Sequence, residues 1–178
     1  MYSTSDSQEM PHNTGTGSPR ILSILLWLSV ALGWLVSTFS VIQEMCMVSA
    51  CRDTASFTIF GFNLGWFGIA YFSLLLLVLW LRKKDCRLEW ALSALVFLGI
   101  GAELRLLWIQ KYVIGGWCPL CVTICCALFV AATLLVIDKF RVAGQGSGVK
   151  ALLGWLALVL AMGAIGLVIA VTGVKALY

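Results

Sequence analysis

The sequence predicts an all-α, polytopic membrane protein, and three observations lead to that prediction. Of its 178 residues, 61% are hydrophobic and 11% are charged, whereas a soluble domain is about 45–50% apolar and about 25% charged. The apolar residues form continuous runs rather than alternating with polar ones, which favours helices over a transmembrane barrel. The length fits one domain. The single histidine, His12, stands in a polar stretch, so we expect neither histidine acid–base chemistry nor a metal site.

The predicted elements follow in chain order. Residues 1–19 are rich in Ser, Thr and Gly, which predicts a disordered cytoplasmic tail. Residues 20–178 form one integral membrane domain. Its apolar runs are each long enough to cross a bilayer, which takes about 20 residues. The helices predicted from these runs cover residues 21–42, 57–81, 88–110, 118–137 and 151–174.

The basic residues predict which side of the membrane each gap occupies. With the N-terminus in the cytoplasm, eight Lys and Arg residues fall on the inner side and three on the outer side, as the positive-inside rule favours. Basic residues in such a chain report topology and lipid contact, so we expect no nucleic-acid partner. The cysteines that this orientation places on the outer side, where disulfides persist, are Cys46, Cys51, Cys118 and Cys121.

Cys118 and Cys121 form a Cys-x-x-Cys pair at the start of the fourth apolar run. Pro119 favours the first turn of a helix, which makes Cys118 the expected helix cap. The helix dipole and the first N–H groups stabilise a thiolate there. The spacing brings both sulfurs to one side of the first turn, as thiol–disulfide exchange requires. A structural disulfide, or a zinc site completed by Cys46 and Cys51, is the alternative.

Cys46 and Cys51 lie in the first polar gap. Four intervening residues allow either a mobile, exchanging disulfide or a static staple, and the second pair on the same side favours exchange. The other cysteines stand in reducing or apolar places, where Cys behaves as a small hydrophobe, and the sequence leaves their roles open. They are Cys86, Cys125 and Cys126.

Glu103 and Arg105 fall in the outer half of the third apolar run. An ionisable residue inside a membrane is a functional candidate by default. The favoured expectation is nevertheless that each side chain reaches the outer interface or pairs with another helix. Trp66, Trp108 and Trp117 fit either the outer interface, where tryptophans gather, or the walls of a site for a planar ligand.

The order of these motifs resembles the vitamin K epoxide reductase family, most closely its bacterial members without a fused thioredoxin-like domain. The resemblance covers about residues 20–140 and extends through the fifth helix. It rests on the loop cysteine pair followed by Ser56, by Phe60-Gly61 and Phe67-Gly68-Ile69-Ala70-Tyr71, and by Cys118-Pro119-Leu120-Cys121. The family implies a four-helix bundle around a quinone, with a fifth transmembrane helix.

The resemblance also implies roles for the cysteines. Cys118 and Cys121 would be the redox pair, with Cys121 nearest the quinone. Cys51 would pass electrons to Cys118, and Cys46 would meet a periplasmic thioredoxin-fold, DsbA-like partner. The implied protein is a quinone-dependent thiol–disulfide oxidoreductase of the bacterial inner membrane that supports disulfide bond formation.

The cofactor that the resemblance implies is ubiquinone or menaquinone. Besides Cys121, we expect it to contact Ser56, Phe60 and Trp117. Leu64 stands where animal members carry Asn, which favours simple quinone reduction over reduction of vitamin K epoxide.

Three alternatives remain. One is vitamin K epoxide reduction itself. Another is the DsbB type of enzyme, in which the tight cysteine pair comes first in the chain rather than second. The third is a transporter or structural subunit with incidental cysteines, which would carry polar residues along several helices.

Overall fold

The computed structural model describes residues 20–45, 57–59, 62–82, 87–144 and 149–176. Within these residues, five helices are long and apolar enough to cross a membrane. Their bounds are α1 Arg20–Met45, α3 Leu64–Leu81, α4 Arg87–Ile109, α5 Pro119–Gly144 and α6 Val149–Gly173. The prediction of an all-α polytopic membrane protein is confirmed.

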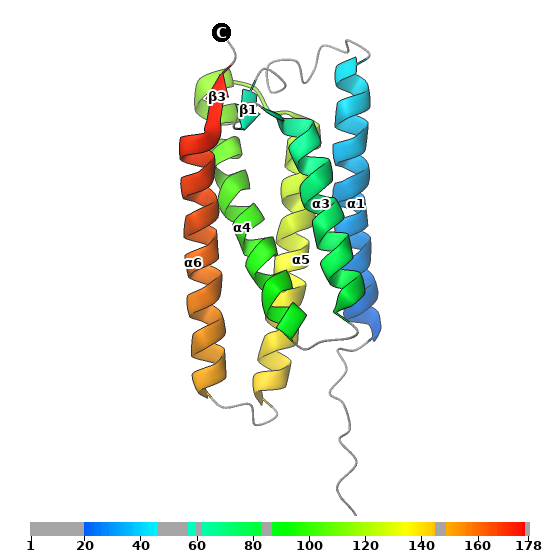
Figure 1. Ribbon diagram of the computed structural model, residues 1–178, viewed down its shortest axis with the longest axis vertical. Helices are drawn as coiled ribbons and strands as arrows, with labels where there is room; N and C mark the ends of the chain where they lie inside the picture. The colour runs from blue at the N-terminus through cyan, green and yellow to red at the C-terminus, as the bar shows by residue number, and fades with distance from the viewer. Residues whose placement is uncertain (1–19, 46–56, 60–61, 83–86, 145–148, 177–178) are drawn as a thin grey trace, which may run out of the picture.

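Four of the helices form a bundle. α1 packs against α3 and α5, and α4 closes the ring by contacting α3 and α5, whereas α6 lies outside and packs chiefly on α4 (Figure 1). The centre of the bundle is a cluster of buried apolar side chains, because each helix turns one stripe inward. Its most buried members include Val30, Phe72, Leu75, Leu92, Val96, Leu128 and Ala131.

Small residues bring α6 close to α4. A Cβ added at Gly101 would collide with the carbonyl oxygen of Gly163, and one added at Gly166 would collide with that of Leu98. Close backbone approach replaces the hydrophobic effect as the driving force between helices in lipid. Trp155 fixes the pairing further, because its Nε1 donates a 3.1 Å hydrogen bond to Ser93 Oγ.

The bundle has two chemically different ends. The cysteine end is the end at which α5 begins at Pro119 and α6 finishes at Gly173. The ion-pair end is the opposite one, where Arg82 bonds to Glu89 at 3.0 Å and to Asp138 at 3.1 Å, and Lys139 bonds to Glu89 at 2.9 Å. These bonds join α3, α4 and α5.

A small sheet lies at the cysteine end and corrects one predicted helix. Residues 57–63 were expected to be helical, but the structure has β1 Phe57–Ile59 and β2 Phe62–Asn63 before α3 starts at Leu64. β1 pairs antiparallel with β2 and with β3, Val174–Ala176, with Thr58 opposite Lys175 (Figure 1). Aromatic and β-branched residues favour strands. A short apolar run does not separate the two states by periodicity.

Other boundaries also differ from the prediction, two of them where contacts explain the difference. A π-helical turn, Gln110–Ile114, follows α4 where a loop was expected from residue 111. α5 continues to Gly144, past the predicted end at 137, because Asp138 and Lys139 are held by ion pairs rather than released to a linker. The predicted tail, residues 1–19, lies outside the described residues.

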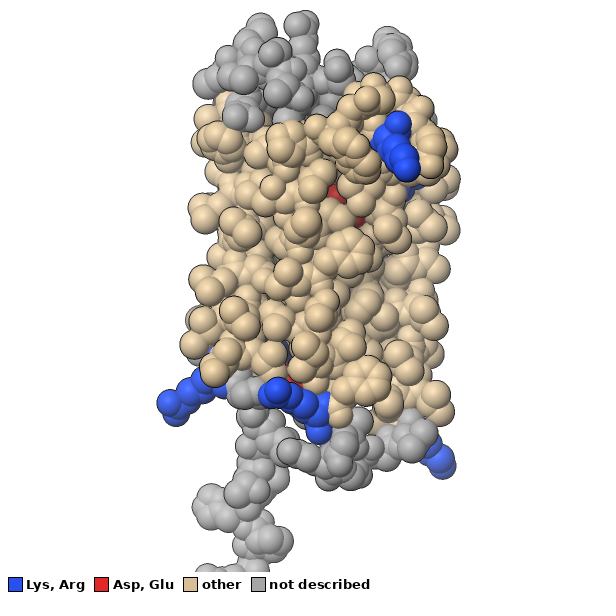
Figure 2. All heavy atoms as spheres, turned by 180° about the vertical axis from the view of Figure 1, so that it is seen from behind, with Lys and Arg blue, Asp and Glu red and all other residues tan. Residues whose placement is uncertain are grey.

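The surface fits a bilayer. Large apolar side chains are exposed along the helices, among them Ile21 at 70% and Leu160 at 73%. Figure 2 shows a broad surface of mostly uncharged residues, with blue Lys and Arg side chains near its two ends and only small areas of red Asp and Glu. Lipid would cover such a surface, whereas water-soluble monomers rarely expose contiguous apolar patches of this kind.

Candidate functional site

Cys118 lies at the cap of α5. Its carbonyl oxygen accepts a 3.1 Å hydrogen bond from the backbone N–H of Val122, the first bond of the helix. The predicted cap position is therefore confirmed, and Pro119 occupies the first helical position. The Cys118 side chain is 4% exposed, and Cys121, one turn into the helix, is partly buried. The first sulfur thus stands where a helix dipole favours its thiolate.

The π-helical turn after α4 positions this cap. The side chain of Gln110 is 1% exposed, and its Oε1 accepts a 3.3 Å hydrogen bond from the Cys118 backbone N–H. The Gln110 carbonyl oxygen accepts a second bond, at 3.2 Å, from the N–H of Gly116. Gly115 allows the reversal because its φ of 71° lies in the left-handed region, which favours glycine. Gln110 therefore ties the end of α4 to the start of α5.

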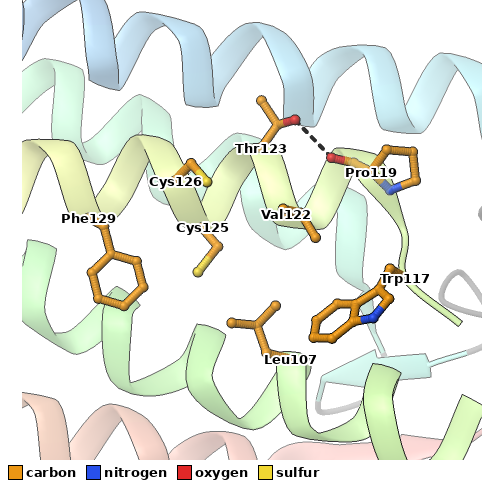
Figure 3. A pocket seen from close by; sticks show the side chains of 8 residues that line it. All are labelled: Leu107, Trp117, Pro119, Val122, Thr123, Cys125, Cys126 and Phe129. Atoms are coloured by element: carbon orange, nitrogen blue, oxygen red, sulfur yellow. Dashed lines mark hydrogen bonds between the residues drawn. The ribbon is translucent and has the colours of Figure 1, made fainter. Parts of the chain in front are cut away.

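An apolar pocket of about 740 Å³ lies between α4 and α5, beginning beside this cap. Figure 3 shows Val122, Cys125 and Phe129 pointing from α5 toward α4, where Leu107 faces them, with Trp117 near the cap. Trp117 is 59% exposed and Phe129 45%, so the pocket opens toward the membrane side of the bundle. The residues that line it are Leu107, Trp117, Pro119, Val122, Thr123, Cys125, Cys126 and Phe129.

The pocket contains only part of the predicted site. Trp117 lines it, and its contact with a planar ligand stays a prediction. Cys121 does not line it but precedes Val122, which does. The remaining predicted site residues lie outside the described residues; they are Cys46, Cys51, Ser56 and Phe60.

Cys125 and Cys126 were not predicted as site residues. Cys125 is 5% exposed, Cys126 is exposed, and both line the pocket as thiols outside any disulfide. The spacing of residues along one face of the predicted helix, counted from Cys118, could have identified Cys125. Spacings of three and four residues share a face, and this face runs through Val122 and Cys125 to Phe129.

Glu103 and Arg105 do not pair with each other within the described residues. The Arg105 guanidinium lies 4.3 Å from the centroid of the Trp108 ring. Glu103 Oε2 and Arg105 Nε are both buried, and neither has a hydrogen-bond partner in the part of the chain that the structure describes. These two atoms therefore have no partner on another helix among the described residues, and the expectation that the side chains reach the outer interface stays a prediction.

The fold defines the class of this chain: a multi-pass helical membrane protein with a thiol motif at one end of its bundle. Comparison with protein-family models, with curated proteins and with solved structures gave no match. The family resemblance therefore stays a prediction that rests on the sequence motifs.

Proposed function

We propose that this protein is a membrane thiol–disulfide oxidoreductase that passes electrons from an external dithiol to a quinone. The observation that supports this most is the juxtaposition of the apolar pocket with the helix turn that Cys118 opens. Ligand pockets are typically about 300–1,000 Å³ with a mostly apolar lining. A pocket walled by an indole and a phenyl ring suits a planar, lipid-soluble molecule.

The residues available fit a quinone. Trp117 and Phe129 offer ring faces, Leu107 and Val122 offer apolar contact, and the opening toward lipid gives room for an isoprenoid tail. A quinone, when bound, accepts two electrons and two protons. Cys121 would lie beside the pocket through its neighbour Val122, and Cys118 would lie behind it at the cap.

The proposed electron path starts outside the membrane. A reduced partner protein breaks the Cys46–Cys51 disulfide, and the freed Cys51 thiolate attacks Cys118 of the Cys118–Cys121 disulfide. Cys46 then attacks Cys51, which restores the Cys46–Cys51 disulfide and leaves Cys118 and Cys121 as thiols. This pair returns to a disulfide by giving up two electrons and two S–H protons to the acceptor, so the cycle balances.

The proposed orientation follows from the charges. The cysteine end faces the periplasm of a bacterial inner membrane, and the ion-pair end faces the cytoplasm, as the positive-inside rule favours. The partner is then a periplasmic thioredoxin-fold, DsbA-like protein that returns to its oxidised form. A cap thiol at a helix N-terminus suits exchange with Cys51, because the helix dipole favours the reactive thiolate.

The test replaces the redox thiols in protein reconstituted with a reduced DsbA-like partner and either ubiquinone or menaquinone. Cys118→Ala and Cys121→Ala each reduce quinol formation, followed by absorbance, to the background rate. Cys86→Ala is the matched control, since it removes a thiol that the sequence places between α3 and α4. Quinol formation at the normal rate in Cys121→Ala would contradict the proposal. A parallel assay with vitamin K epoxide separates the two candidate substrates.

A further inference from the structure

The carboxyl group of Glu103 lies inside the membrane-spanning part of the bundle and forms no ion pair with the residues that the structure describes. Glu103 belongs to the apolar span Leu88–Ile114, and its Oε2 is buried with no hydrogen-bond partner among the described residues. The nearest basic residue in sequence, Arg105, is engaged with Trp108 at 4.3 Å instead. An ionised carboxylate at such a place is costly, so the group retains its proton until a neighbour takes it.

Two titratable side chains lie within electrostatic reach of this carboxyl group. α3 and α5 both pack against α4, and each brings one titratable side chain that interacts electrostatically with Glu103, Tyr71 from α3 and Cys125 from α5, while residues 151–173 of α6 include no titratable side chain. The Tyr71 hydroxyl already donates a 2.8 Å hydrogen bond to the Leu95 carbonyl oxygen. The Cys125 thiol is not in a disulfide. Cys125 is therefore the neighbour through which a proton can leave Glu103.

Cys125 connects the carboxyl group to the pocket. Its side chain is 5% exposed and lines the pocket, and Figure 3 shows its sulfur on the side of α5 that faces α4. Leu107, which lines the pocket from α4, follows Glu103 by four residues and shares its helix face. Glu103 thus lies one helical turn from Leu107, on the face of α4 that lines the pocket.

We infer that Glu103 is the proton donor of this site and that it acts on the pocket through the Cys125 thiol. This inference rests on the proposed function and adds the route by which one of the two protons reaches the acceptor. As an acceptor in the pocket takes the electron pair, the Cys125 S–H bond breaks and an O–H bond forms on the acceptor. Glu103 gives its proton to the Cys125 sulfur and is restored by one of the two protons released when Cys118 and Cys121 rejoin, while the other released proton forms the second O–H bond on the acceptor.

The kinetic test compares variants of the reconstituted protein. Glu103→Gln keeps the shape of the side chain but holds no transferable proton, so quinol formation falls about 100-fold, as expected for loss of a general acid. The alkaline limb of its pH–rate profile disappears as well. Cys125→Ala gives a loss of the same order, whereas Cys125→Ser, which keeps a proton-bearing group, restores most of the rate.

Glu89→Gln is the matched control for the carboxyl group. It makes the same substitution in the same helix at the ion-pair end, and it leaves the pH–rate profile unchanged even where it lowers stability. If Glu103→Gln does not fold, Glu103→Asp, which retains an acid, tests the same point through its pH–rate profile.

Infrared spectroscopy gives a readout that needs no quinone. At neutral pH, wild-type protein shows a carbonyl stretch from a protonated carboxyl group that is absent in Glu103→Gln and shifted in Cys125→Ala. Absence of that band overturns the inference, whether or not the protein reduces quinone. If wild-type protein reduces quinone and Glu103→Gln does so at the same rate with the same pH profile, the inference fails and the proposed function stands. If wild-type protein reduces no quinone, the proposed function fails.

Discussion

The two ends of the bundle differ in how far the hydrogen-bonding groups of their polar side chains are satisfied. At the ion-pair end, Arg82, Lys139, Glu89 and Asp138 all find partners within 3.1 Å across three helices. The half of the bundle toward the cysteine end contains buried polar atoms that have no hydrogen-bond partner among the described residues. These atoms are Ser37 Oγ, Glu103 Oε2, Arg105 Nε and Gln110 Nε2. Burying each such atom costs free energy. The ion-pair end therefore contributes to the stability of the fold, whereas the unsatisfied atoms in the other half reduce it.

That difference shows where chemistry is expected in a helical membrane protein. Sequences tend to satisfy every local rule except where a site requires otherwise. The half of the bundle that breaks the rule also includes the thiol motif and the pocket. We therefore expect substitutions at the ion-pair end to change stability, and substitutions at the cysteine end to change reactivity more than stability.

The largest expected effect on stability is at Arg82. Arg82→Ala removes the common partner of Glu89 and Asp138, whose side chains are only 28% and 12% exposed. Leaving Asp138 without its cation lowers the free energy of unfolding by about 3 kcal/mol, as for other broken buried pairs. Thermal unfolding in detergent measures this. Arg141→Ala, which removes an exposed arginine from the last turn of the same bundle end, leaves the midpoint unchanged. Equal midpoints for the two variants would contradict the comparison.

A smaller effect on stability, with a change in reactivity, is expected at Gln110. Gln110→Leu loses the 3.3 Å bond to the Cys118 N–H, worth about 1 kcal/mol, and also removes the unsatisfied Nε2, which offsets that loss. The free energy of unfolding therefore changes little. The cap is no longer tied to α4, so Cys118 in reduced protein is alkylated faster by a water-soluble maleimide. Unchanged alkylation together with a large loss of stability would give Gln110 a purely structural role.

The smallest effect is expected at Ser37. Its side chain is 1% exposed, and its Oγ has no hydrogen-bond partner among the described residues. Ser37→Ala removes that unsatisfied group and raises the free energy of unfolding by about 1 kcal/mol. Chemical denaturation in detergent can resolve this change. A loss of stability instead would indicate that the hydroxyl group is satisfied after all and would weaken the contrast between the two ends.

Long-range contacts explain which parts of the fold the sequence could predict. Continuous apolar runs located all five helices, because spanning a bilayer requires length and hydrophobicity that local sequence displays. The first residues of the second run became β1 instead, because β1 pairs with Val174–Ala176 from the far end of the chain. The end of α5 was underestimated because Asp138 depends on Arg82 of another helix. No local pattern reveals such partners.

For the site, too, the sequence predicted the local features but not those that depend on contacts between distant residues. Pro119 and the cysteine spacing located the cap that the structure has, since capping is a local property. The contribution of Gln110 was missed because it depends on a π-helical turn that brings its side chain to Cys118. Cys125 was noted only as a small hydrophobe, although its spacing from Cys118 placed it on the pocket face.

The pairing of β1 with β3 sets an order of assembly. β1 precedes α3, α4, α5 and α6 in the chain, and β3 follows all of them. During synthesis the sheet therefore cannot close until the last helix has entered the bilayer. A chain released before that point would have its helical bundle but not the closed sheet at the cysteine end. Closure of this sheet is thus a late step in biogenesis, and it marks a chain whose five helices have all been inserted.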